Sequence, residues 1–121
     1  MIKLKRVYDR IEVTDGERIL VDRLWPRGIR RSTSNIDIWV KNVAPSNELR
    51  KWYAHDPKKW VRFKARYKAE LKDNAALNKL IQIVTNADPV TFLYSSKDEK
   101  RNNAVVLLDV LNRMMKKQAR S

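Results

Sequence analysis

The alternation of apolar and polar residues along the chain predicts three β-strands. Residues 2–8 alternate apolar side chains with lysine before a β-branched and aromatic end, which is typical of a strand. Residues 18–25 form a mostly apolar run that ends at Pro26. Residues 90–94 are consecutive β-forming residues behind a proline, and they give the clearest strand prediction in the chain.

A turn signal, Asp15-Gly16, separates the first two predicted strands. These strands either form a hairpin through the turn or run parallel, with residues 9–16 as a longer connection. The pattern does not choose between the two, and we favour the parallel arrangement.

Apolar residues at helical spacing predict helices between and after the strands. A short helix is expected within residues 29–44, because Ile36, Trp39, Val40 and Val43 fall at i, i+3, i+4 and i+7. Residues 104–118 predict a terminal helix that is apolar at its start and polar at its end. Capping residues mark three further positions, the last of which either interrupts a helix or begins a new one: Ser46, Asp56-Pro57 and Asp73-Asn74.

Strands separated by helical stretches indicate the α/β class. A chain of 121 residues is long enough for one hydrophobic core and too short for two. We therefore predict a single compact domain over residues 1–121, with a small, mainly parallel sheet of about three strands and helices on both faces.

The chain is strongly basic, with 27 Lys and Arg against 14 Asp and Glu and a net charge of +13. The excess is spread over both halves, so no basic tail stands apart from the domain. A charge of this size indicates either an acidic partner or a generally basic surface without one.

Several classes of protein are excluded by composition. The absence of cysteine excludes disulfides, zinc ribbons and thiol nucleophiles. The two glycines, Gly16 and Gly28, cannot form a glycine-rich phosphate loop or a dinucleotide fingerprint, so we expect no cofactor. Apolar runs are too short for a membrane span and the N-terminus lacks a signal-peptide pattern, so we expect no membrane partner and a cytoplasmic location.

Polar residues follow two of the predicted strands, where α/β proteins bind ligands. If those strands are parallel, their ends meet at one edge of the sheet. Guanidinium groups can clamp a phosphate or carboxylate, which makes a small anionic ligand the first functional hypothesis; the same arginines could instead lie over Trp25 and Trp52 as cation-π pairs. The candidate ligand-binding residues are Arg23, Arg27, Arg50, Tyr94, Lys97 and Asn103.

Two residues are candidates for catalysis, Asp22 and His55. Asp22 interrupts an apolar strand, so we predict that it is buried and paired with Arg23 or Arg50, either as a structural ion pair or as a carboxylate that handles the ligand. His55 is the one histidine, which excludes a two-histidine metal site, and we predict no metal site. A lone histidine before an Asp-Pro helix start is more often a capping or loop residue than a catalytic one.

The alternative function is binding of nucleic acid without sequence specificity. Solvated lysines and arginines on a helix face would contact phosphates and leave the bases unread. The residues for this role are Lys58, Arg62 and Arg66 on one predicted helix and Arg113, Lys116 and Lys117 on the last one.

The chain also resembles the YeaO-like proteins of the domain-of-unknown-function family 488. The resemblance covers nearly the whole chain and is most specific in the run Val21-Asp-Arg-Leu-Trp-Pro-Arg-Gly28. It implies a small cytoplasmic α/β domain and no established reaction. Many relatives have Asn-His-Ala where this chain has Asn102-Asn103-Ala104, so a histidine there is not essential to the shared function. Family signature residues map to Asp22, Arg23, Trp25, Arg27, Ser46, Arg50, His55, Tyr94 and Asn102.

Overall fold

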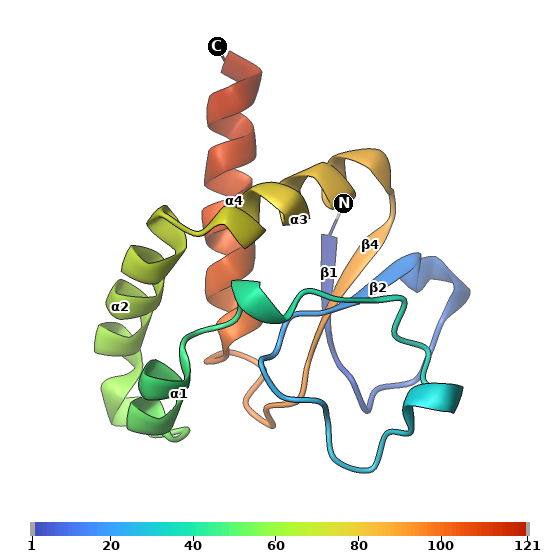
Figure 1. The fold of residues 1–121 in the computed structure, drawn as a ribbon, viewed down its shortest axis with the longest axis horizontal. Helices are drawn as coiled ribbons and strands as arrows, with labels where there is room; N and C mark the ends of the chain where they lie inside the picture. The colour runs from blue at the N-terminus through green and yellow to red at the C-terminus, as the bar shows by residue number, and fades with distance from the viewer. Residues whose placement is uncertain (1, 121) are drawn as a thin grey trace.

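Four parallel strands form one sheet in the order β1-β4-β2-β3 (Figure 1). The computed structural model describes residues 2–120, with Arg120 described by its backbone alone. The strands are β1 (Ile2–Arg6), β2 (Glu17–Leu20), β3 (Ile38–Trp39) and β4 (Val90–Tyr94). The α/β class and the parallel sheet are therefore confirmed, with four strands in place of about three.

Strand β4 is the centre of the sheet, and all five of its residues are buried. It pairs with β1 on one edge and with β2 on the other. The first two strands in the sequence are therefore parallel, as favoured, but they are not neighbours. A hairpin through the Asp15-Gly16 turn is excluded because β4 lies between them.

The structure has the α-helices α1 (Asn47–Tyr53), α2 (Trp60–Lys72), α3 (Ala75–Asn86) and α4 (Asn103–Arg120), and the expected capping residues precede the first three. The Ser46 hydroxyl accepts a hydrogen bond from the Leu49 amide at 3.1 Å and caps α1. Asn74 accepts from the Ala76 amide at 2.8 Å, so it begins a new helix rather than interrupting α2. Asp56 likewise caps the short 3₁₀ turn η4 (Pro57–Lys59) that leads into α2.

The helix predicted within residues 29–44 is wrong. This segment holds the 3₁₀ turns η2 (Arg31–Thr33) and η3 (Lys41–Val43) on either side of β3. Strand β3 pairs with Ile19 and Leu20 of β2, so its backbone hydrogen bonds go to the sheet edge. The apolar residues with helical spacing do not share one face: Ile36 and Trp39 pack in one cluster, and Val40 and Val43 pack in the other.

The two faces of the sheet are covered differently. Buried residues of all four α-helices pack in one cluster with Ile19 of β2 and Phe92 of β4. The opposite face carries Leu20 and Leu93, which are covered by aromatic and aliphatic side chains from residues 25–39. This second cover was expected to be helical. It is instead a loop with 3₁₀ turns, and the strand predicted over 18–25 ends at Leu20 because the chain turns away to form that loop.

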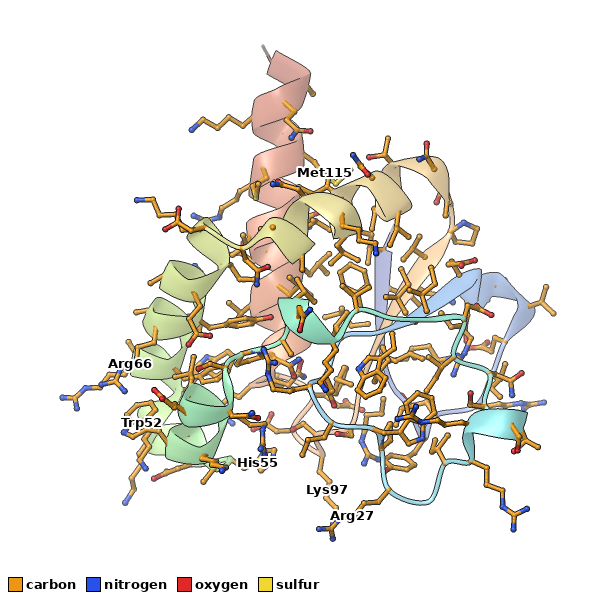
Figure 2. All side chains as sticks on the ribbon, in the orientation of Figure 1. Arg27, Trp52, His55, Arg66, Lys97 and Met115 are labelled. Carbon is orange, nitrogen blue, oxygen red and sulfur yellow. The ribbon has the colours of Figure 1, made fainter. Side chains whose placement is uncertain are left out.

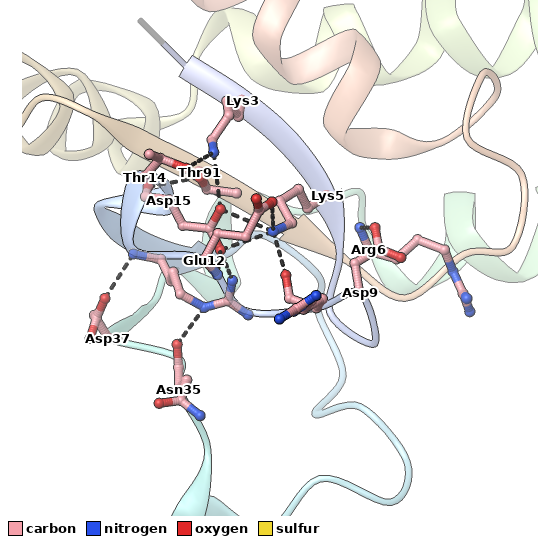
Figure 3. Close-up of polar contacts among 12 residues, drawn as sticks. Lys3, Lys5, Arg6, Asp9, Glu12, Thr14, Asp15, Asn35, Asp37 and Thr91 are labelled. Atoms are coloured by element: carbon pink, nitrogen blue, oxygen red, sulfur yellow. Dashed lines mark hydrogen bonds and ion pairs between the residues drawn. The ribbon is translucent and has the colours of Figure 1, made fainter.

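A buried carboxylate, Asp15, anchors the start of β2 (Figure 3). Its side chain is 1% exposed and accepts hydrogen bonds from Lys3, Lys5 and Arg18 and from the Glu12 amide. Burial by itself would raise the pKa of Asp15, but these hydrogen bonds outweigh it and hold the pKa well below its usual range. The turn predicted at Asp15-Gly16 thus supplies the buried carboxylate that binds three cationic side chains.

Candidate functional site

A cavity of about 780 Å³ lies at the carboxyl ends of the strands. Its walls come from the residues after β1, the loop 22–27 after β2, the end of α1, and the loop 95–103 between β4 and α4. Figure 2 shows Arg27, His55 and Lys97 at the same lower edge of the molecule. The position agrees with the expectation that parallel strand ends converge on a ligand site.

The structure brings most of the predicted site residues to this cavity. Those that line it are Asp22, Arg23, Arg27, Arg50, His55, Lys97 and Asn103. Tyr94 does not, because alternate residues of β4 face the helical side of the sheet and Tyr94 is buried there. Burial, together with the nearby Glu99 and Asp9 charges, raises the pKa of its phenol.

Asp22 is only partly buried, and the prediction that it pairs with an arginine is wrong. Its Oδ2 accepts hydrogen bonds from the Ser95 amide at 2.9 Å and from the Ser95 hydroxyl at 2.7 Å. Its Oδ1 accepts from Asn103 Nδ2 at 3.1 Å. Neutral donors at the two ends of the segment 95–103 therefore satisfy this carboxylate, and it joins that wall of the cavity to the loop 22–27.

Two arginines build the walls through backbone carbonyls. Arg23 donates from Nε to the Pro45 carbonyl at 2.8 Å and from Nη2 to the Ala44 carbonyl at 3.1 Å. Arg6 donates from Nε to the Ser96 carbonyl at 2.9 Å and from Nη2 to the Ser95 carbonyl at 3.2 Å. Both guanidinium groups are fixed in place and add positive charge to the cavity.

Three other cations in the cavity have unused donors. Arg50 Nε is buried and has no hydrogen-bond partner among the described residues, and its Nη2 reaches Asn47 Oδ1 only at 3.5 Å. The side chains of Arg27 and Lys97 are exposed and make no hydrogen bond or ion pair within residues 2–120. Arg27 and Lys97 are therefore accessible to an anion, and Arg50 contributes an unsatisfied donor in the cavity wall.

His55 follows α1 in an unusual backbone conformation. Ala54 and His55 both have positive φ, of 46° and 59°, so the chain turns sharply between α1 and the Asp56 cap. The turn places the exposed imidazole on the cavity wall, with its ring centroid 6.4 Å from that of Tyr53. A serine nucleophile would need a hydrogen bond to a base such as His55. Among the described residues no such bond joins Ser95 to His55, and the Ser95 hydroxyl donates to Asp22 instead.

The cation-π alternative for the predicted arginines is not what the structure shows. Other residues cover the two tryptophans: Arg31 lies 4.9 Å from the Trp25 ring centroid, and Arg66 lies 4.3 Å from that of Trp52. The described residues show no cation-π contact for the three predicted arginines, which line the cavity: Arg23, Arg27 and Arg50.

The sequence comparisons place the chain in a family. A family model described as "Inactive DUF488-N3 subclade" matches residues 1–121. The chain belongs to this family. It is 44% identical to "Uncharacterized protein YeaO" of Escherichia coli (strain K12), covering 91% of this chain and 96% of that protein. It is also 44% identical to "Uncharacterized protein Rv3073c" of Mycobacterium tuberculosis (strain ATCC 25618 / H37Rv), covering 92% of this chain and 93% of that protein. No solved structure matches the chain significantly.

The residues proposed for nucleic acid lie away from the cavity. Lys58, Arg62 and Arg66 are exposed, although Lys58 lies in η4 just before α2 and not on the same helix as the other two. We call these three residues the α2 basic face; Figure 2 shows Arg66 and Trp52 on the flank of the molecule. On α4, Arg113 is paired with Asp109 at 3.3 Å, which reduces its free charge. Lys116 and Lys117 are exposed near the end of that helix.

Sequence reasoning missed two cavity residues at the carboxyl end of β1, Arg6 and Tyr8. The rule that located the other residues, which looks beyond the carboxyl ends of parallel strands, applies to β1 as well and would have found them. Sequence reasoning also missed the exposed Leu24, because an apolar side chain does not indicate catalysis or the binding of an anion.

Among residues 2–120, no group of three or more His, Cys, Asp or Glu side chains is arranged to hold a metal ion. Within the same residues, no helix is both long and apolar enough to cross a membrane.

Proposed function

We propose that the protein binds a small anionic ligand, of phosphate-like chemistry, in the cavity at the carboxyl ends of its strands. The observation that carries the proposal is Arg50, whose buried Nε has no partner among the described residues while its side chain lines the cavity. A buried donor on a charged group is costly to leave unsatisfied, so such groups usually have a partner. A bound anion would supply it.

The charge of the cavity supports the same ligand class. Seven Lys and Arg side chains and one carboxylate are among the described residues that line it. The carboxylate, Asp22, already accepts three hydrogen bonds. A concave site lined by one sign of charge concentrates the opposite ion, and guanidinium groups bind planar and tetrahedral anions through paired donors.

We assign the cavity a binding role and no reaction. The family description calls the subclade inactive, and because the chain belongs to it we expect no catalytic activity. Asp22 and His55, the two candidates for catalysis, fit this role as positioning and wall residues, since Asp22 holds Ser95 and Asn103.

Thermal unfolding with and without millimolar inorganic phosphate tests the proposal. A ligand present at 100 times its Kd stabilises the folded state by about 2.7 kcal/mol. We expect the wild type to gain stability, and Arg27→Gln to lose most of the gain while its stability without anion is unchanged or slightly higher, because close like charges repel in an empty site. Arg50→Gln should behave similarly.

Arg30→Gln is the matched control, since it removes the same charge from an exposed position outside both the cavity and the α2 basic face. Its response to phosphate should equal that of the wild type. If no anion stabilises the wild type, and Arg27→Gln is simply less stable, these arginines are scaffold and the proposal fails.

A second proposal is contact between the α2 basic face and the phosphates of nucleic acid. It rests on the exposure of all three of its side chains, of which Figure 2 shows Arg66 on the flank of the molecule. Because those side chains lie outside the cavity, the two proposals are tested independently.

A further inference from the structure

Two exposed apolar side chains line the same cavity as the free cations. Tyr8 is 46% exposed and Leu24 is 55% exposed, although most large apolar side chains of the described residues are covered. Exposed apolar surface next to concentrated charge is typical of a ligand site with two kinds of subsite. An inorganic anion would use only the charged part.

Because exposed apolar side chains and unpaired cations line one cavity, we infer that the ligand joins a planar ring to its anionic group, as a nucleoside monophosphate does. We infer that Tyr8 stacks on the ring. The inference rests on the proposed anion site and adds the chemical class of the ligand. The cavity volume of about 780 Å³ leaves room for such a molecule and exceeds what a single phosphate needs.

The Tyr8 ring is held rigidly, which favours stacking. Its hydroxyl donates to the Arg27 carbonyl at 2.8 Å, and the Arg6 guanidinium carbon lies 5.1 Å from the ring centroid. Arg6 is itself fixed by two carbonyls of the loop after β4. A ring that is already ordered loses little conformational entropy when a second ring packs against its exposed surface.

The same contacts connect the ring subsite to the anion subsite. The Tyr8 hydroxyl bonds to the backbone of Arg27, and the Arg27 side chain is one of the unpaired cations of the cavity. The stacking surface and the charge therefore belong to adjacent residues in space. One molecule carrying both groups can contact them together.

Calorimetric titration of the full chain with matched ligands tests the inference. The probes are inorganic phosphate, ribose 5-phosphate, adenosine 5′-monophosphate and adenosine, with acetate and benzoate as a carboxylate pair. Base stacking on an aromatic side chain corresponds to roughly a 5- to 150-fold gain in affinity. We expect adenosine 5′-monophosphate to bind more tightly than ribose 5-phosphate by a factor in that range, and adenosine without phosphate to bind weakly.

Two variants of Tyr8 test whether this residue is the source of the gain in affinity. Tyr8→Leu should lower affinity for adenosine 5′-monophosphate to that for ribose 5-phosphate, and leave the latter unchanged. Tyr8→Phe keeps the ring and should keep most of the gain, which separates stacking from loss of the hydroxyl. Val61→Ala, which trims an exposed apolar side chain outside the cavity, should change neither affinity.

The outcomes separate this inference from the proposed function. Equal affinity for each ligand with and without its ring overturns the ring subsite and leaves the anion site standing. A gain seen for benzoate over acetate alone supports the ring and identifies the anion as a carboxylate. A gain that survives Tyr8→Leu overturns the role of Tyr8, and failure of every anion to bind overturns both proposals.

Discussion

Replacing the buried Asp15 by asparagine should destabilise the protein strongly. The substitution keeps the shape of the side chain and removes its charge, while Lys3, Lys5 and Arg18 all donate to the carboxylate in the folded state. An amide cannot accept all of these bonds, and its own N–H group would face a cationic donor. The main loss is therefore electrostatic.

The magnitude follows from how far each cation can return to water. Breaking a buried ion pair by removing one partner costs about 3–5 kcal/mol. Arg18 is 6% exposed and would be stranded, whereas Lys3 is 32% exposed and can be solvated again. We therefore expect a loss near the lower end, about 3 kcal/mol.

Thermal and urea unfolding measure this loss. At about 2.1 cal/mol/K per residue, the 121-residue chain has an unfolding entropy of about 0.25 kcal/mol/K, so Tm should fall by about 12 °C. The folded-state pKa of Asp15 is lowered. Its contribution is thus complete above the pKa of about 3.9 in the unfolded chain, and is lost as pH falls through the folded pKa. The difference between variant and wild type should be constant from pH 5 to 8 and shrink at more acidic pH.

Glu12→Gln is the matched control in the same cluster. The Glu12 carboxylate also pairs with Lys5, at 3.1 Å, but it is 58% exposed. Exposed ion pairs contribute about 0–1 kcal/mol, so this variant should remain close to the wild type. If Asp15→Asn also stays within about 1 kcal/mol of the wild type, the argument that burial makes this carboxylate essential is refuted.

Three further predictions concern other parts of the molecule. Gly16→Ala should cost at least about 2 kcal/mol, because φ is +64° and a Cβ would lie 2.1 Å from the Pro89 carbonyl oxygen; Gly28→Ala, with φ +78° and open space, should cost about 1 kcal/mol in the same urea assay. Tyr67→Phe should cost about 1–3 kcal/mol, since the Val43 carbonyl loses a buried 2.7 Å hydrogen bond, and an unchanged urea midpoint would contradict this. Duplex DNA should bind weakly through the α2 basic face and lose affinity steeply with salt in titrations at two salt concentrations, whereas sequence preference or salt-resistant affinity would contradict phosphate contact alone.

Local signals in the sequence determined most of the elements. Ser46 and Asn74 begin helices because their side chains satisfy amides within the next three residues, an interaction that depends on nothing distant. The all-apolar run of β4 indicates a strand buried on both faces, and that strand is the centre of the sheet. Parallel strands then bring their carboxyl ends to one edge, which located the cavity and seven of the residues that line it.

Only the tertiary structure decided which acidic residue is buried with an arginine. The reasoning that an enclosed carboxylate needs a cation holds, but it applies to Asp15 with Arg18 and not to Asp22. Sequence spacing could not tell them apart, because burial depends on which distant segments cover each position. The same reason explains residues 29–44, where pairing with β2 at the sheet edge outweighed a helical pattern of apolar residues. Long-range packing selects among structures that local patterns leave equally favourable.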